Sequence, residues 1–237
     1  MLLPGVRLDL HNHTSFSPDG RLTPRELLLA AAERGIHCLA ITDHDCLEGA
    51  LEALALAEAD SSLPRVIPGI EITTTEGEII GLYVHRPIPP GLELLEAVER
   101  VRSQGGLVYL PHPCDRLRRG AVSKKARMLA ASLADIVEVL NGRALTPRAQ
   151  RKAAMLARKA GKVCGAGSDA HVWSEVGSAF VLVEDYPTRE TLVSVVGGGI
   201  VVGTLGAMDY TVNWMFRGLA PIMRLRHERA RSGLIDR

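Results

Sequence analysis

The amino-acid sequence predicts an α/β fold in which a mainly parallel sheet closes, or nearly closes, into a barrel. Apolar runs of strand length alternate with longer runs bounded by helix caps, which is the order of repeated β-α-β units. The chain has 237 residues, of which 46% are hydrophobic, and this is enough for one large core. Histidines and acids follow the strand-like runs, and α/β barrels build their sites at that rim.

The first half of the chain shows this alternation most clearly. Thr23, Pro24 and Gly35 mark a helix with an N-cap, a proline at its first position and a glycine stop. The pair Glu76-Gly77 favours a hairpin turn between two strands. We expect strands at 6–10, 38–42, 66–74 and 78–84, and helices at 24–35 and 47–58.

The second half continues the pattern, with Thr146 as a helix N-cap and Gly161 as a stop. The uncharged stretch 191–208 approaches the length of a membrane span, but its glycine cluster indicates a helix end, a turn and a buried strand. We expect strands at 107–110, 136–140, 163–167 and 179–183, and helices at 92–104, 123–132, 147–160 and 188–196.

The composition divides the chain into a barrel domain, 1–208, and a C-terminal tail, 209–237. We expect the tail to form an amphipathic helix with a basic, solvated face, and a patch that binds anionic partners is the alternative. The basic residues of the tail include Arg217, Arg224, Arg226, Arg229 and Arg231.

Charge and cysteine usage narrow the class of protein. A net charge of +1 gives no global field that favours a membrane, and we expect nucleic acid only as a substrate. The four cysteines form no C-x-x-C pair, and no secretory signal precedes the first motif. We therefore expect a reduced, cytoplasmic protein, of unknown oligomeric state.

Five of the eight histidines lie in four short motifs that predict a multinuclear metal site. His11 and His13 are two residues apart at a strand end, so their side chains point to the same side and can reach one ion. Asp19 follows them in Pro18-Asp19-Gly20, where it is either a further ligand or a turn residue. Imidazole and carboxylate together suit zinc, iron and manganese.

The next motifs bring further candidate ligands. His44, at the end of a buried strand, is expected to bind a metal ion, with Asp43 or Asp45 orienting an imidazole. Glu71 lies inside the nearly apolar strand P-G-I-E-I-T, where a carboxylate is costly unless it is paired or bound to a metal.

The second half supplies the remaining candidates. His112 is held between two prolines, and Asp169 and His171 repeat the spacing of the first two histidines. Glu138, another acid in a buried strand, is either a ligand or a residue that orients one. We expect the other three histidines to be structural; they are His37, His85 and His227.

Arginines follow two of these motifs and predict a phosphate site. Guanidinium groups bind phosphate through two parallel hydrogen bonds, and Arg116 and Arg143 are the best placed for a substrate. Asp43, or a protonated histidine such as His171, is the candidate proton donor to a leaving alkoxide.

The ordered motifs resemble those of the PHP domain, the polymerase and histidinol phosphatase superfamily, over residues 6–185. The resemblance implies a distorted (β/α)7 TIM-like barrel with two or three divalent ions, zinc, manganese or iron, at its C-terminal rim. It groups the ligands into three sets: His11, His13, Glu71 and Asp169; Glu71, His112 and a residue near Glu138; Asp19, His44 and His171. Many members carry a histidine in the strand after G-I-E, where this chain reads Glu78-Ile79-Ile80-Gly81, and His85 is one replacement to consider.

The activity that this resemblance implies is hydrolysis of a phosphoester by a stand-alone enzyme. Bridging metal ions would lower the pKa of bound water, supply a hydroxide and polarise the phosphoryl oxygens. The substrates to expect are phosphomonoesters, nucleotides or oligonucleotide ends. Two alternatives stay open, namely a metallohydrolase of the same barrel type that attacks an amide or lactone, and a non-catalytic binding module.

Overall fold

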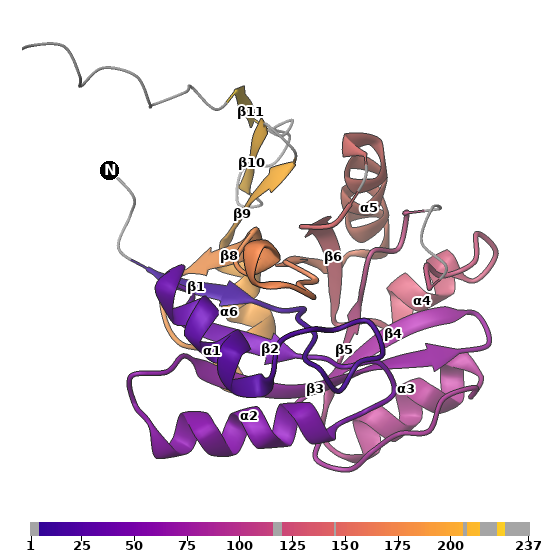
Figure 1. The fold of residues 1–237 in the computed structure, drawn as a ribbon. Coiled ribbons are helices and arrows are strands. Elements are labelled where there is room, and N and C mark those ends of the chain that lie inside the picture. The colour runs from indigo at the N-terminus through magenta and orange to yellow at the C-terminus, as the bar shows by residue number, and fades with distance from the viewer. Residues whose placement is uncertain (1–4, 116–119, 145, 206–207, 214–221, 226–237) are drawn as a thin grey trace, which may run out of the picture.

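The computed structural model describes residues 5–115, 120–144, 146–205, 208–213 and 222–225. Its strands form one eleven-stranded sheet, in which seven consecutive strands, β1 to β7, are neighbours in chain order (Figure 1). These are β1 (Val6–Asp9), β2 (Cys38–Ile41), β3 (Arg65–Thr74), β4 (Gly77–Leu82), β5 (Leu107–Leu110), β6 (Ile136–Asn141) and β7 (Val163–Gly167). The sheet continues beyond β1 with β8 (Ala179–Val183), β9 (Ile200–Leu205), β10 (Met208–Asn213) and β11 (Ile222–Leu225).

The sheet curves so that the end of β7 returns to the end of β1. The Leu10 amide donates to Ala166 O at 3.2 Å, and the Asp169 amide donates to His11 O at 2.7 Å. A parallel bridge joins Asn12 and Ala170 just beyond the two strands. The predicted barrel is therefore confirmed as a mixed α/β fold with a nearly closed, barrel-shaped sheet.

Among β1 to β7, one strand runs against the others. β1, β2 and β3 are parallel, as are β5, β6 and β7, whereas β4 is antiparallel to both of its neighbours. The predicted hairpin turn at Glu76-Gly77 is confirmed, because Thr74 pairs with Gly77 across it. Gly77 has a φ of +129°, a backbone conformation that residues with a side chain rarely adopt.

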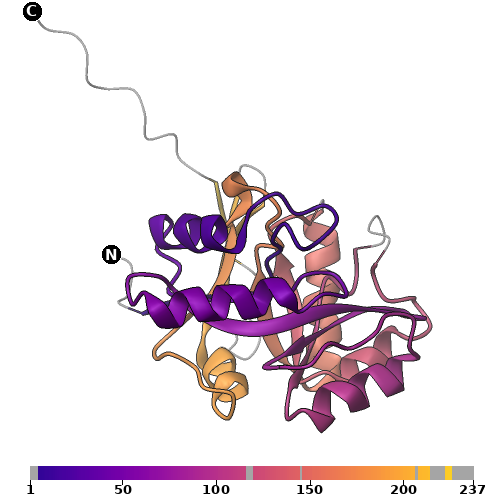
Figure 2. The same cartoon turned by 60° about the horizontal axis from the view of Figure 1, so that its bottom comes forward.

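Helices follow most of the strands and lie outside the barrel, where α2 covers β3 (Figure 2). The predicted N-caps are confirmed, because Thr23 caps the first helix in a capping box with Glu26, and Thr146 caps the fifth. None of the described helices is long and apolar enough to cross a membrane. The helices are α1 (Pro24–Glu33), α2 (Glu48–Ala59), α3 (Leu94–Ser103), α4 (Arg127–Leu133), α5 (Pro147–Ala160) and α6 (Leu192–Gly198), with a 3₁₀ turn at Trp173–Glu175.

The tail differs from the expected helix wherever the structure describes it. Met208–Asn213 and Ile222–Leu225 are strands β10 and β11, and β10 pairs antiparallel with β9. The run Tyr210-Thr211-Val212 consists of aromatic and β-branched residues, which favour extended backbone, and β9 offers it an edge to pair with. The other residues expected in the helix, 214–221 and 226–237, lie outside the described residues.

Candidate metal centre

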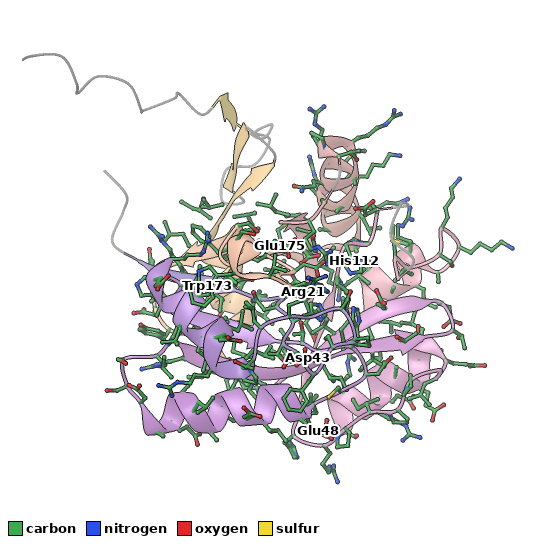
Figure 3. The ribbon with its side chains drawn as sticks, in the orientation of Figure 1. Arg21, Asp43, Glu48, His112, Trp173 and Glu175 are labelled. Atoms are coloured by element: carbon green, nitrogen blue, oxygen red, sulfur yellow. The ribbon has the colours of Figure 1, made fainter. Side chains whose placement is uncertain are left out.

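Five histidines and several acids converge at the rim where the parallel strands end. Figure 3 labels one of the histidines, His112, together with Asp43. His11 and His13 follow β1, His44 follows β2 and His112 follows β5, so chain topology alone brings them to one edge of the barrel. Most side chains of this cluster are buried, which is costly for groups of this polarity unless they share ions or hydrogen bonds.

Glu71 lies at the middle of the cluster. Its Oε2 atom is 3.2 Å from His11 Nε2, 3.2 Å from His13 Nε2 and 3.3 Å from His44 Nδ1. Its Oε1 atom is 3.0 Å from His112 Nε2. Burial would raise the pKa of Glu71, but the charge of His11 and the hydrogen bonds from His11, His112 and His13 together outweigh this and hold the pKa well below its usual value. The predicted ligand Glu71 is thus placed to bridge two ions.

A first group of ligand atoms comes from His11, His13 and Asp169. The two Nε2 atoms are 3.1 Å apart, and Asp169 Oδ1 is 3.8 Å and 3.6 Å from them. Ligand atoms that are each about 2.1 Å from one ion lie roughly 3.0–3.5 Å apart at octahedral to tetrahedral angles. The group therefore closes around one ion with a small adjustment of Asp169.

A second group comes from His13, His44 and His171. Asp19 lies next to two of these histidines. His171 Nε2 is 3.1 Å from Asp19 Oδ2 but makes no hydrogen bond, and Asp19 Oδ1 is 4.0 Å from His44 Nε2. Two polar atoms that approach closely without hydrogen bonding are typical of ligands around a shared ion. The structure thus brings together the set of Asp19, His44 and His171 that the sequence predicts.

The backbone is strained at two of these ligands. His112 has a φ of +27° and Asp169 a φ of +53°, in the left-handed region that side chains disfavour. Such conformations persist where surrounding contacts hold them, and they cluster at functional sites. Here the backbone amide of Asp169 donates a hydrogen bond to His11 O, and the backbone amide of His112 donates one to Glu138 Oε2 at 2.6 Å.

Ser17 and Asp43 orient His13 from behind. Ser17 Oγ donates to Asp43 Oδ1 at 2.8 Å, so it accepts from His13 Nδ1, 2.9 Å away, and the Nε2 lone pair faces the cluster. Asp43 also accepts from the Thr14 amide at 2.6 Å and its hydroxyl at 2.7 Å. Burial raises the pKa of Asp43, against the opposing effect of these hydrogen bonds. The predicted proton donor is therefore engaged in holding the loop after His13.

Glu138, predicted as a metal ligand or an orienting residue, contacts the far side of His11. Its Oε1 atom is 3.2 Å from His11 Nδ1 and accepts from the Tyr109 hydroxyl at 3.0 Å. Its Oε2 atom accepts from the His112 amide and from Asn141 Nδ2. These bonds use both oxygens of Glu138, which lies where the register between β6 and β7 shifts. In the described structure Glu138 orients His11 and His112, and its oxygens do not lie among the grouped ligand atoms.

Arg143 is the predicted substrate residue that the structure describes at the site. Its Nη1 atom is 2.8 Å from His171 Nδ1, and its Nε atom is 3.5 Å from Glu175 Oε1. Burial and the charge of Arg143 lower the pKa of His171 to about 4. Arg116, the other predicted substrate residue, lies outside the described residues.

Glu78 belongs to the site although the sequence patterns did not indicate it. Its Oε1 atom is 3.9 Å from His44 Nδ1, and its Oε2 atom is 3.7 Å from His112 Nε2. The antiparallel direction of β4 puts its first residues beside the rim and its last residues at the opposite edge. His85 follows that last end and is exposed, so it does not replace the missing histidine. Only the register of the β3–β4 hairpin shows that Glu78 lies at the rim and His85 at the opposite edge.

The donor set fits divalent transition metal ions. Each of four groups offers three ligand atoms that lie within 4.8 Å of one another. Imidazoles and carboxylates in this number match the ligands that zinc, manganese and iron take in proteins. The groups are His13, His44 and His171; His11, His13 and Asp169; His11, Glu71 and His112; His44, Glu71 and Glu78.

Three proteins are similar to this chain in sequence. An uncharacterised protein of Methanocaldococcus jannaschii is 36% identical over 179 residues, which are 74% of this chain and 70% of the relative. A 3',5'-nucleoside bisphosphate phosphatase of Chromobacterium violaceum is 38% identical over 109 residues, 42% of this chain and 37% of that protein. The 5'-3' exoribonuclease Rnm of Salmonella typhimurium is 36% identical over 108 residues, 44% of this chain and 36% of that protein.

Solved structures show the same fold. A two-domain protein of Bacteroides vulgatus with a PHP-like part superposes with a TM-score of 0.65 at 15% identity, over 84% of this chain and 65% of that one. An amidohydrolase of Chromobacterium violaceum superposes with a TM-score of 0.60 at 21% identity, over 77% and 92%.

Two family models match consecutive parts of the chain. The model of the PHP domain covers residues 9–158, and that of the PHP-associated region covers residues 147–199. The first match spans more than half of the chain and contains most of the ligands described above. The chain belongs to the PHP family.

Proposed function

We propose that the protein is a metal-dependent phosphoesterase. The observation that carries the proposal is one buried carboxylate, Glu71, within 3.3 Å of four histidine nitrogens, with the Arg143 guanidinium 2.8 Å from the fifth histidine of the cluster. A bridged metal cluster beside a guanidinium provides the two kinds of positive charge that a phosphate ester requires.

The metal ions would be held by the histidines and acids grouped above, and when bound they supply Lewis acidity for attack on a phosphorus centre. Glu138 and Ser17 hold the imidazoles of His11 and His13 with Nε2 toward the ions. With a pKa near 4, His171 is neutral at pH 7, which suits a ligand and not a proton donor.

The proposed substrates are small phosphomonoesters, nucleotides and oligonucleotide ends. Two relatives are named for hydrolysis of phosphate esters of nucleotides or RNA, and each matches a little over two fifths of this chain. Arg143 is our proposal for the residue that binds the phosphoryl oxygens, because its side chain is 36% exposed beside His171. Arg116 stays a proposal from the sequence.

Metal analysis and hydrolysis assays test this function together. The purified chain should retain at least two divalent ions, lose hydrolysis of phosphomonoesters on chelation and regain it on adding Mn²⁺ or Zn²⁺. Asp169→Asn should lose nearly all activity and keep its fold, because the site lies at the rim and not in the core. Hydrolysis of amides or lactones instead of phosphate esters would contradict the proposal, as would a metal-loaded protein without hydrolytic activity.

A further inference from the structure

The two ends of the cluster differ in the chemistry of their ligands. One end consists of the imidazoles of His13, His44 and His171. The other end combines His112 with carboxylate oxygens of Glu71 and Glu78, and Glu78 also lies 3.9 Å from His44 at the boundary between the two ends. Carboxylates suit magnesium and manganese, whereas imidazoles suit zinc, copper, iron and nickel.

Glu78 is held where it can serve as a ligand. Its backbone amide donates to Gly120 O at 2.8 Å, which ties the start of β4 to the loop after His112. A Cβ atom on Gly120 would collide with the Glu78 carboxylate, so the loop packs directly over that group. The Glu78 side chain is only 14% exposed.

The ligand distances agree with an ion between these residues. Glu78 Oε2 is 3.7 Å from His112 Nε2, and His112 Nε2 is 3.0 Å from Glu71 Oε1. Atoms that share one ion are roughly 3.0–3.5 Å apart, so a shift of a few tenths of an ångström brings Glu78 and His112 to this spacing. Ligand atoms of Glu71 and Glu78 lie within 4.8 Å of each other. His85, the other candidate from the sequence, is exposed beyond the far end of β4.

We propose that Glu78 is a metal ligand in this chain and that it makes the cluster select two different ions. The oxygen-rich end, which consists of Glu71, Glu78 and His112, takes a hard ion such as Mn²⁺. The nitrogen-rich end, which consists of His13, His44 and His171, takes Zn²⁺. This inference rests on the proposed metal dependence and adds that the two subsites bind different ions.

Metal competition in the full-length chain tests the inference without an activity assay. Metal-free protein is equilibrated with buffered mixtures of Mn²⁺ and Zn²⁺, separated from free metal, and its bound ions are counted. Wild type should keep both ions. Glu78→His should lower the ratio of bound Mn²⁺ to Zn²⁺ by about tenfold or more, and Glu78→Gln should weaken Mn²⁺ binding by about tenfold or more, while Zn²⁺ at the other end is retained.

Two further variants separate a ligand from a structural residue. Glu76→His makes the same replacement in the adjoining turn and should keep the wild-type ratio. Gly120→Ala retains the Glu78 carboxylate but displaces it, and it should weaken Mn²⁺ binding selectively. Circular dichroism confirms that each variant is folded, and Glu78→Asp, with its shorter carboxylate, replaces any variant that is not.

The outcomes distinguish this inference from the proposed function. A wild type that binds no ions contradicts both. Ions that are retained equally by wild type, Glu78→His and Glu78→Gln contradict the role of Glu78 and leave the metal centre in place. Two zinc ions and no manganese in wild type, with free Mn²⁺ buffered in large excess over free Zn²⁺, contradict the selection of different ions.

Discussion

At the scale of single residues, the position of one serine affects a metal ligand. Replacing Ser17 with alanine removes the hydroxyl that accepts from His13 Nδ1 and donates to Asp43. The His13 ring then loses its fixed tautomer, and we expect metal affinity to fall by about ten- to a hundredfold, as for other residues that orient ligands. Titration against a chelator of known affinity measures this.

Ser15 provides the control for that substitution. It lies in the same loop and is exposed, and its amide bonds to Leu22 O without using the side chain. Ser15→Ala should bind metal as wild type does. Equal affinities in the two variants would show that the hydroxyl of Ser17 does not orient His13.

Arg143 tests the phosphate site at the same scale. If its guanidinium binds phosphoryl oxygens, Arg143→Ala should lower kcat/KM by about ten- to a hundredfold, because a charge-assisted hydrogen bond contributes about 1.5–3 kcal/mol. Metal content should not change. Arg148→Ala, an exposed arginine on α5, is the control. Wild-type kinetics in Arg143→Ala would place the phosphate elsewhere.

At the scale of elements, the hairpin of β3 and β4 couples backbone geometry to the site. A side chain on Gly77 would meet the backbone of Val122 at 2.5 Å, at a φ of +129°. Gly77→Ala should therefore destabilise the fold by about 1–3 kcal/mol and weaken metal binding through Glu78. Thermal unfolding and metal titration measure the two effects.

Gly198 is the matched control for the hairpin substitution. It ends α6, has no atom within 4 Å of an added Cβ and has a helical backbone, so Gly198→Ala should be neutral or slightly stabilising. A Gly77→Ala protein as stable as wild type would contradict the strain that we assign to this turn.

The sequence predicted elements well where local signals agreed. Thr23 and Thr146 mark the starts of α1 and α5 through side-chain caps, and Glu76-Gly77 marks the hairpin. The strands in the tail were mispredicted because Arg224 and Met223 suggested an amphipathic face, whereas pairing with β9 depends on distant residues. Long-range pairing of this kind has no local signature.

Site residues divide in the same way. Strand-end histidines and the buried Glu71 could be predicted, because burying a polar group in an apolar run requires a reason. Glu78 could not be predicted, because acidic residues are common next to turns. Only the hairpin register places it near His112. Glu138 could be placed in the site but not assigned, since its role depends on which way the carboxylate turns.

At the scale of the whole molecule, metal-free protein should lose stability as the pH rises from about 6.5 to about 10. Burial of His11 disfavours its charged form, but Glu71 and Glu138 outweigh this and raise its pKa from 6.5 to about 10. In that range the folded state holds a proton that the unfolded chain has released. This stabilisation is complete below about pH 6.5 and is lost as the pH passes through the folded value.

Bound metal ions should remove this dependence, because an imidazole must lose the competing proton before it binds an ion. Thermal unfolding between pH 6.5 and 10 should show a falling Tm for chelated wild type and a smaller fall for chelated His11→Gln, while His85→Ala, an exposed histidine, should follow wild type. The difference between variants isolates His11 from other groups that titrate in this range. Metal-loaded wild type should not show the His11-dependent fall. Parallel curves for wild type and His11→Gln would show that the cluster does not hold this proton.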